Sequence, residues 1–382
     1  IIKVENTGSI TVVLAPTVID VNDSRIVAAG KDGVTLTQFK FTAQNEELMV
    51  TKARIRITSA SASADVSDDI VELKLYDGAT LVAGPLNLTP ASAAGTMDAY
   101  ADFQNIVGFT VPKDGTKVLT VKAKLQTVSA GADPGDNFGA DLAYAQEFKA
   151  VGTSGSTTLT SVGSSNLAGN KVYIRKGQPK IELVPLGTSV LINGTQNMLK
   201  FKITAIDNDV AIKHIEIQTV LAGAGAVGDP DLDTTTIREE GTGTNIAITS
   251  ATASTSNAVT FNISFDSEQQ ISAGNSKTYE FRATLTQATA GDTAATSLLS
   301  DTTDYITGDL ETLAANATIQ DREGTNLIGN DESAASVAFN FIWSDMSAIP
   351  HNDTSDGSED WTTGRYVRGT PTDTQSLTYP AS

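Results

Sequence analysis

The chain lacks the residue types on which most catalytic sites depend. Among its 382 residues there is no cysteine, and there are only two histidines, His214 and His351. The absence of cysteine excludes disulfides, thiolate nucleophiles and thiolate metal ligands. Two isolated histidines leave almost no material for a Ser-His-Asp triad or a zinc site, and no Gly-rich phosphate loop is found. We therefore expect no enzymatic activity, although the many Asp and Glu residues leave a carboxylate-only hydrolase open.

Long apolar runs and positive charge are also scarce. No stretch reaches the roughly 18–20 apolar residues that cross a bilayer, and no signal-peptide pattern occurs, so we predict no membrane span. The chain has 26 Lys and Arg against 45 Asp and Glu, a net charge of −19. Such an acidic surface repels phosphate backbones and argues against nucleic acid as a partner. The chain opens at Ile1 inside a strand-like pattern, so we expect a processed product or a fragment.

Aromatic residues make up only 6% of the chain, and Thr, Ser, Ala, Gly and Val take their place. This balance is typical of many short strands joined by polar turns. Apolar and polar residues alternate along 34–43 and again along 70–76, which is the period of a half-buried strand. Asp77 and Gly78 then form a tight-turn signal before a second strand at 80–83. The pattern predicts an all-β chain built from β-sandwiches.

An internal repeat divides the chain into two similar parts. The stretch 39–43, Phe-Lys-Phe-Thr-Ala, recurs at 201–205 as Phe-Lys-Ile-Thr-Ala, an offset of 201 − 39 = 162. The strand pattern at 116–125 recurs at 276–285, an offset of 276 − 116 = 160. Several matches in the same order indicate a duplication. We therefore predict two tandem Ig-like β-sandwich domains.

The stretch 172–185 joins the two repeats. We interpret it as the last strand of one domain running into the first strand of the next, and similar outlines occur at 1–16 and, more loosely, at 337–350. The predicted segments are an N-terminal strand at 1–8, sandwich domains at 9–176 and 177–345, and a C-terminal extension at 346–382. The predicted inter-domain junction consists of Val172, Ile174, Lys176, Gly177 and Ile181.

By the same comparison, residues 1–5 correspond to a closing strand whose own domain is absent from this chain. Ile1, Lys3 and Glu5 would lie on one face of that strand, and Ile2 and Val4 on the other. A strand of this kind can complete the sheet of another subunit through main-chain hydrogen bonds. We predict that this stretch forms an assembly strand.

Asp229, Asp231 and Asp233 alternate along a short acidic stretch. Calcium prefers several hard oxygen ligands, and alternate aspartates can supply them from one turn. The stretch lacks the glycine and the distal glutamate of an EF-hand loop, and an ordinary solvated turn is the favoured alternative. Calcium is the only cofactor that the sequence suggests.

The remaining rare side chains have structural interpretations that we favour. His214 shares a strand face with Glu216, and we expect His214 to be an exposed strand residue, in preference to a ligand or a base. Trp343 and Trp361 are the only tryptophans. They could form a sugar-binding platform, but large aromatics that cover one end of the second sandwich are the simpler interpretation.

The C-terminal residues resemble a known group of proteins. The stretch 341–347, Phe-Ile-Trp-Ser-Asp-Met-Ser, is followed at 360–377 by Asp-Trp-Thr-Thr-Gly-Arg-Tyr-Val-Arg-Gly-Thr-Pro-Thr-Asp-Thr-Gln-Ser-Leu. This pattern resembles the C-terminal segment of large secreted β-sandwich surface proteins from uncultured, small-genome bacteria. It differs in having Met346 and Thr370 where Asn and Leu are common. The resemblance implies a secreted, surface-associated prokaryotic protein and transfers no catalytic residue.

Together these features favour a structural role. We expect a subunit of an extracellular filament or surface layer, with copies of itself as partners, because a head-to-tail contact through a donated strand does not close on itself. The alternative is a cell-surface adhesin or carbohydrate-binding module with a glycan partner.

The calcium hypothesis predicts a lower melting temperature when EDTA is added, because an ion bound only by the folded state stabilises it. Melting followed by circular dichroism with EDTA, and then with excess calcium, measures the effect. An unchanged melting temperature in both conditions would leave the three aspartates as a solvated turn.

Overall fold

The computed structural model describes residues 7–15, 26–59, 66–91, 99–155, 157–169, 171–223, 231–255, 257–301, 319–320, 326–328, 337–338, 340–348, 351 and 360–381. The chain divides into two compact units, Ile1–Arg175 and Lys176–Ser382. The described residues are almost entirely strands and turns, with one short helix, α1 (Val66–Asp69), and a 3-10 turn at Val128–Ala130. The predicted all-β fold is therefore confirmed.

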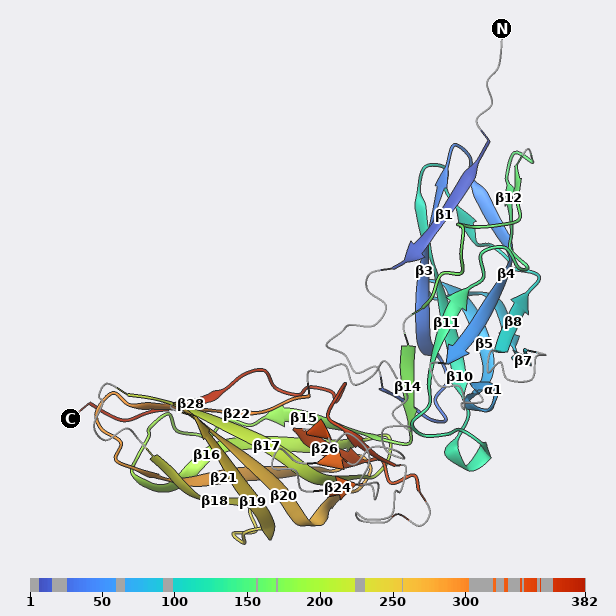
Figure 1. Ribbon diagram of the computed structural model, residues 1–382. Helices are drawn as coiled ribbons and strands as arrows, with labels where there is room; N and C mark the ends of the chain where they lie inside the picture. The colour runs from blue at the N-terminus through green and yellow to red at the C-terminus, as the bar shows by residue number, and fades with distance from the viewer. Residues whose placement is uncertain are drawn as a thin grey trace. The chain divides into compact units, whose positions relative to one another are not determined.

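The first unit is a sandwich of two sheets (Figure 1). One sheet has five strands in the order β1 (Ser9–Leu14), β3 (Val34–Gln44), β10 (Thr116–Leu125), β5 (Ile70–Asp77) and β6 (Thr80–Leu86). The main path of the other sheet is β13 (Thr158–Leu159), β12 (Lys149–Gly152), β4 (Leu48–Ser59), β11 (Asn137–Leu142), β14 (Lys171–Arg175) and β2 (Ile26–Ala28). Beside β4 lie β8 (Ala99–Phe103) and β9 (Thr110–Val111), and β7 (Thr89–Pro90) pairs with β8.

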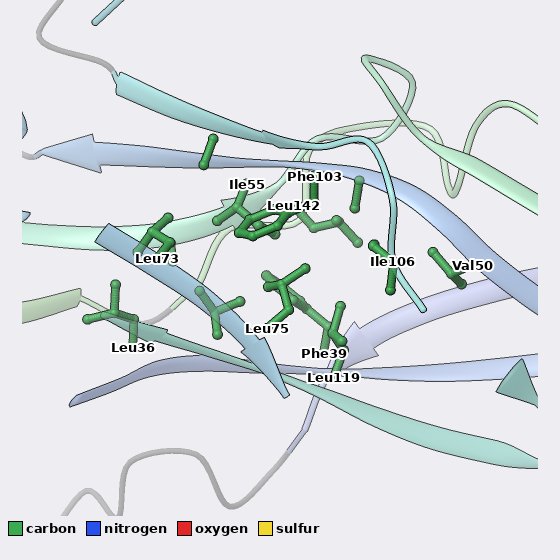
Figure 2. Packing of buried hydrophobic residues seen from close by; sticks show 14 of the residues in the cluster. Leu36, Phe39, Val50, Ile55, Leu73, Leu75, Phe103, Ile106, Leu119 and Leu142 are labelled. Atoms are coloured by element: carbon green, nitrogen blue, oxygen red, sulfur yellow. The ribbon is translucent and has the colours of Figure 1, made fainter. Parts of the chain in front are cut away.

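Alternation along the strands places the apolar side chains between these two sheets. On β3, Phe39 and Phe41 are fully buried, whereas Lys40 between them is only partly buried. Figure 2 shows Phe39 and Leu75 from one sheet packed near Ile55 from the other. Burying one such side chain stabilises the fold by about 1.5–3 kcal/mol, so this shared layer holds the two sheets together.

The second unit contains a corresponding pair of sheets. The first has the order β15 (Gln178–Leu183), β16 (Gly194–Ile206), β21 (Ser276–Thr286) and β18 (Asp231–Glu239). The main path of the second is β19 (Ile248–Thr255), β20 (Ala258–Ile271), β17 (Val210–Ala222), β22 (Thr293–Leu298) and β28 (Gln375–Thr378), with β26 (Phe341–Ser344) paired to β17 and β27 (Trp361–Thr363) paired to β26. A small separate sheet contains β24 (Asn326–Ile328), β23 (Ile319–Gln320) and β25 (Val337–Ala338).

The strand pairings of the first unit recur in the second. β3 lies between β1 and β10, just as β16 lies between β15 and β21. β14 pairs with β11 and runs parallel to β2, with Arg175 opposite Ala28. β28 pairs with β22, and its Thr378 forms a parallel bridge to Val190. The parallel partners Ala28 and Val190 are related by the same offset, 190 − 28 = 162, that the sequence repeat shows.

This correspondence changes the interpretation of the C-terminal region. The sequence suggested a second domain that ends at 345 and an extension at 346–382, but β27 and β28 occupy the places of β13 and β14. Within the described residues, 360–381 therefore contribute strands to the second unit. The strand that matches β14 is β28, and not the stretch 337–350.

The connection between β22 and β26 is longer than its counterpart in the first unit, so β26, β27 and β28 do not follow the sequence offset of the repeat. In the first unit β11 ends at Leu142 and β12 begins shortly afterwards at Lys149, whereas in the second unit β22 ends at Leu298 and β26 begins only at Phe341. An offset search along the sequence therefore loses its register before β26. None of the helices in the described part of the chain has the length and apolarity that crossing a bilayer requires.

Replacing Leu377 with Ala tests whether β28 belongs to the second sandwich. Leu377 is fully buried and pairs with Ala294 on β22, so the substitution should lower the free energy of unfolding of this unit by about 2–5 kcal/mol. Both tryptophans lie in the second unit, so tryptophan fluorescence during urea unfolding follows it selectively. The exposed neighbour Ser376 provides the control, because Ser376→Ala should change the free energy by less than about 0.5 kcal/mol. Equal stability of the two variants would place β28 outside the cooperative unit.

Candidate functional site

The predicted junction residues lie on two consecutive strands that belong to different units. Val172 and Ile174 are buried in β14, the last strand of the first unit. Ile181 is buried in β15, the first strand of the second unit. The connection between the strands consists of residues 176 and 177 alone.

These two connecting residues are held by the second unit. The main-chain N–H of Lys176 donates to Oδ2 of Asp345 over 2.7 Å, and its ammonium donates to the carbonyl of Met346 over 3.0 Å. A Cβ added to Gly177 would lie 2.9 Å from Cβ of Asn208, so a larger residue has no room there without a shift. The described contacts of residues 176 and 177 are therefore made within the second unit.

The predicted assembly strand, Ile1, Ile2, Lys3, Val4 and Glu5, lies outside the described residues, as does Asp229. The backbones of Asp231 and Asp233 begin β18, opposite Thr286 and Thr284 of β21. Among the described residues, no group of three or more His, Asp or Glu side chains could hold a metal ion. Calcium at the three aspartates stays a prediction.

The strand that follows the predicted assembly strand is an edge strand. β1 pairs with β3 from Ser9 opposite Gln44 to Leu14 opposite Phe39. Its solvent face includes Val13, which is 54% exposed although it is apolar. In the described part of the chain, β3 is the only strand that pairs with β1.

His214 is not exposed, in contrast to the expectation from the sequence. His214 and Glu216 are both fully buried on β17, and Nδ1 of His214 lies 3.0 Å from Oγ of Ser264. Burial lowers the pKa of His214 to about 3, which keeps the ring neutral at physiological pH. The alternation correctly placed the two side chains on one face, but it could not show that this face is covered.

The second histidine is held between two carboxylates. Nδ1 of His351 lies 2.7 Å from Oδ2 of Asp360, and Nε2 lies 2.9 Å from Oε2 of Glu268. Burial alone would lower the pKa of His351, but the bonds to Glu268 and Asp360 raise it above its usual range. The hydroxyl of Ser344 donates to Asp360 over 2.8 Å, and Ser344 is fully buried. Because Ser344 bonds to the carboxylate and not to the imidazole, the group lacks the geometry of an activated nucleophile.

Asp69 and Asp136 form a buried acid pair in the first unit. Both residues are 1% exposed, and Asp136 is among the neighbours that influence the pKa of Asp69. Oδ1 of Asp69 also accepts the main-chain N–H of Asp133 over 3.0 Å. Burial is the main cause that raises the pKa of Asp69 to about 7, with repulsion from Asp133 and Asp68 as smaller causes. Asp69 therefore titrates near neutral pH in the folded unit. Sequence reasoning missed the pair because the two residues are far apart in the chain.

Other buried carboxylates tie loops to strands. Asp301 accepts the main-chain N–H groups of Asn340 and Gly364, each over 2.8 Å, while burial raises its pKa to about 6. Asp141 accepts the main-chain N–H of Gly169 over 2.9 Å. These acids satisfy backbone donors inside the fold and present no accessible catalytic group.

Both tryptophans are buried as well. Trp343 is fully buried and Trp361 is 1% exposed, and the indole N–H of Trp343 donates to the carbonyl of Thr363 over 2.8 Å. A sugar platform needs an exposed aromatic face, so these two side chains do not provide one. Both tryptophans are therefore interior residues of the second unit.

Comparison with known proteins shows a weak likeness to bacterial surface proteins. No protein-family model matches the sequence, and no curated protein matches it. Solved structures that are similar include the C-terminal domain of the Streptococcus pyogenes antigen I/II-family protein AspA, at 8% identity and TM-score 0.21, covering 77% of this chain and 95% of that one. Another is the 35 kDa C-terminal fragment of the major pilin GBS80 of Streptococcus agalactiae, at 10% identity and TM-score 0.20, covering 77% and 85%. These two neighbours are a domain of an antigen I/II-family protein and a fragment of a pilin.

Replacing Asp69 with Asn should remove a pH dependence from the first unit. The pKa of Asp69 is about 7 in the folded state and 3.8 in the reference state, so the folded state binds the extra proton between these values. Its stabilising effect is complete below about pH 4 and is lost as the pH rises to about 7. The variant should therefore gain on the order of 3–4 kcal/mol over the natural chain above pH 7, and nothing near pH 4.

Urea unfolding at several pH values, followed by circular dichroism, measures this difference for the first unit, while tryptophan fluorescence monitors the second. The second-unit transition serves as the internal control, because Asp69 belongs to the first unit. A stability difference that does not change between pH 4 and pH 8 would contradict the raised pKa of Asp69.

Proposed function

We propose that this protein is a structural subunit of an extracellular, pilus-like filament or surface layer, secreted to the cell surface and assembled from copies of itself. The observation that carries the proposal is the repetition of one sandwich topology in two units joined by residues 176 and 177. Repeated modules with a short connection suit a structural building block.

The chemistry of the described side chains supports the same proposal. His351 and Ser344 are engaged by the same carboxylate, Asp360, and Asp69 is buried against Asp136. Each of these groups satisfies a neighbour within its own unit. We propose on this basis that the protein is not an enzyme.

The proposed mode of assembly is strand complementation through Ile1, Ile2, Lys3, Val4 and Glu5. Their alternation provides an apolar face, Ile2 and Val4, that can enter a sandwich margin of another copy. Main-chain hydrogen bonds supply affinity in such a contact, and alternate side chains supply register.

Deleting residues 1–8 should abolish assembly while both units stay folded. Negative-stain electron microscopy of the full chain should show fibres or a lattice, and the truncated chain should show single particles. The melting transitions of the two units, followed by circular dichroism and tryptophan fluorescence, provide the control for folding. Ordered assemblies of the truncated chain would rule out the donor role, and a full-length monomer that binds glycans would favour an adhesin.

A further inference from the structure

The free edges of the two equivalent sheets are treated differently. These sheets end in four edge strands, β1 and β6 in the first unit and β15 and β18 in the second. An exposed strand edge presents unpaired N–H and C=O groups that invite another strand, so proteins usually cover or guard such an edge.

Three of the four edges are covered by their own chain. The carbonyl of Val82 on β6 accepts the N–H of Val107 over 2.9 Å. On β18, the carbonyl of Ile237 accepts the N–H of Ile246 over 2.8 Å. On β15, the N–H of Ile181 donates to the carbonyl of Arg368 over 2.8 Å. In the part of the chain that the structure describes, no such bond reaches the outer edge of β1.

The repeat allows β1 and β15 to be matched position by position. Val12 lies opposite Phe41, and Ile181 lies opposite Ile203. The partners Phe41 and Ile203 are related by the repeat offset, 203 − 41 = 162. Val12 therefore matches Ile181, the residue whose N–H is bonded to Arg368.

At the matched positions, β15 carries residues that protect an edge. Pro179 has no N–H to offer, and Lys180 and Glu182 are charged. Glu182 accepts from both Lys180 and Lys202, each over 2.9 Å, and these bonds lower its pKa to about 2.

The corresponding residues of β1 offer no protection. Ile10 takes the place of Pro179, Thr11 that of Lys180, and Val13 that of Glu182. Val13 is 54% exposed and lies opposite Lys40, just as Glu182 lies opposite Lys202. Of these two matched strands, the one whose outer edge has no bond from a described segment is therefore also the one without a proline or a charge.

The direction of the backbone groups follows from the same pairing. The N–H of Ala15 donates inward to the carbonyl of Gln38, over 3.0 Å. Backbone groups alternate in direction along a strand, so those of Ile10, Val12 and Leu14 point to the free edge. The match of Val12 with Ile181, which donates outward, gives the same direction independently.

We propose that the free edge of β1, from Ile10 to Leu14, is the acceptor for the strand of residues 1–5 of a second copy. The proposal rests on the proposed function and names the surface that receives the strand. The donor stretch is close in length to β1, so the two can pair along most of that edge. Ile2 and Val4 would then extend the apolar layer that Val12 and Leu14 begin at the margin of the core.

The test transfers the protection of β15 to β1. The chain with Ile10→Pro, Thr11→Lys and Val13→Glu carries at each position the residue that the second unit already accommodates. Assembly seen by negative-stain microscopy should be lost while the melting temperature is retained. Leu81→Glu, at an exposed position on β6 of the same sheet, provides a matched charge control and should still assemble. If the proline variant fails to fold, Thr11→Lys with Val13→Glu is the milder form, because the new carboxylate would face Lys40.

A binding measurement separates this proposal from the proposed function. A labelled peptide of residues 1–8 should bind the chain that lacks residues 1–8. Adding the three β1 substitutions, Ile10→Pro, Thr11→Lys and Val13→Glu, to that chain should weaken binding at least tenfold. Peptide binding that is unchanged by the three β1 substitutions would overturn the acceptor assignment, even if deleting residues 1–8 abolishes assembly. Assembly that survives the deletion would overturn the donor role of residues 1–5, and with it this acceptor assignment, but it would leave the filament or surface-layer proposal standing. A discrete dimer that persists after the deletion but is lost with the three β1 substitutions would mean that two β1 edges pair with each other. That result would also overturn the proposal.

Discussion

The need of every strand for backbone hydrogen-bond partners on both sides organises this molecule. Central strands such as β3 and β17 meet that need through their neighbours. An edge strand lacks a neighbour on one side, so its outer backbone groups need partners from elsewhere. In the second unit the C-terminal residues provide partners: β28 pairs with β22, and the carbonyl of Arg368 accepts the N–H of Ile181 on β15. The same requirement sets β1 apart, because it is an edge strand and no described segment bonds to its outer side.

Buried polar groups follow the same principle at the level of side chains. Asp301 is buried at a cost that raises its pKa to about 6, but it satisfies the backbone N–H groups of Asn340 and Gly364. Asp360 likewise forms hydrogen bonds with the side chains of Ser344 and His351. In an acidic chain without cysteine, carboxylates are the available strong acceptors, and here they hold loops against strands instead of forming an accessible site.

The candidate site shows what sequence reasoning can and cannot reach. Local signals were sufficient for the strands of the junction, because Val172, Ile174 and Ile181 belong to clear apolar patterns. The burial of His214 could not be read, because period-2 alternation separates two faces of a strand without showing which face is covered. The acid pair of Asp69 and Asp136 was also beyond reach, because it is created by segments that meet only in the folded unit.

The sequence by itself determined the strand-rich fold and the duplication, because alternation and a repeat offset can be recognised along the chain without knowing which strands pair. It also contained the contrast between Ile10 and Pro179, but not its meaning. Only the tertiary structure decided which strands are edges and that β28, not the stretch from 337, closes the second sandwich. It also showed that no described segment bonds to the outer edge of β1. The physical reason is that strand pairing is non-local. The connection between β22 and β26 can lengthen without altering the pairing, so distance along the chain stops indicating which backbone groups will meet.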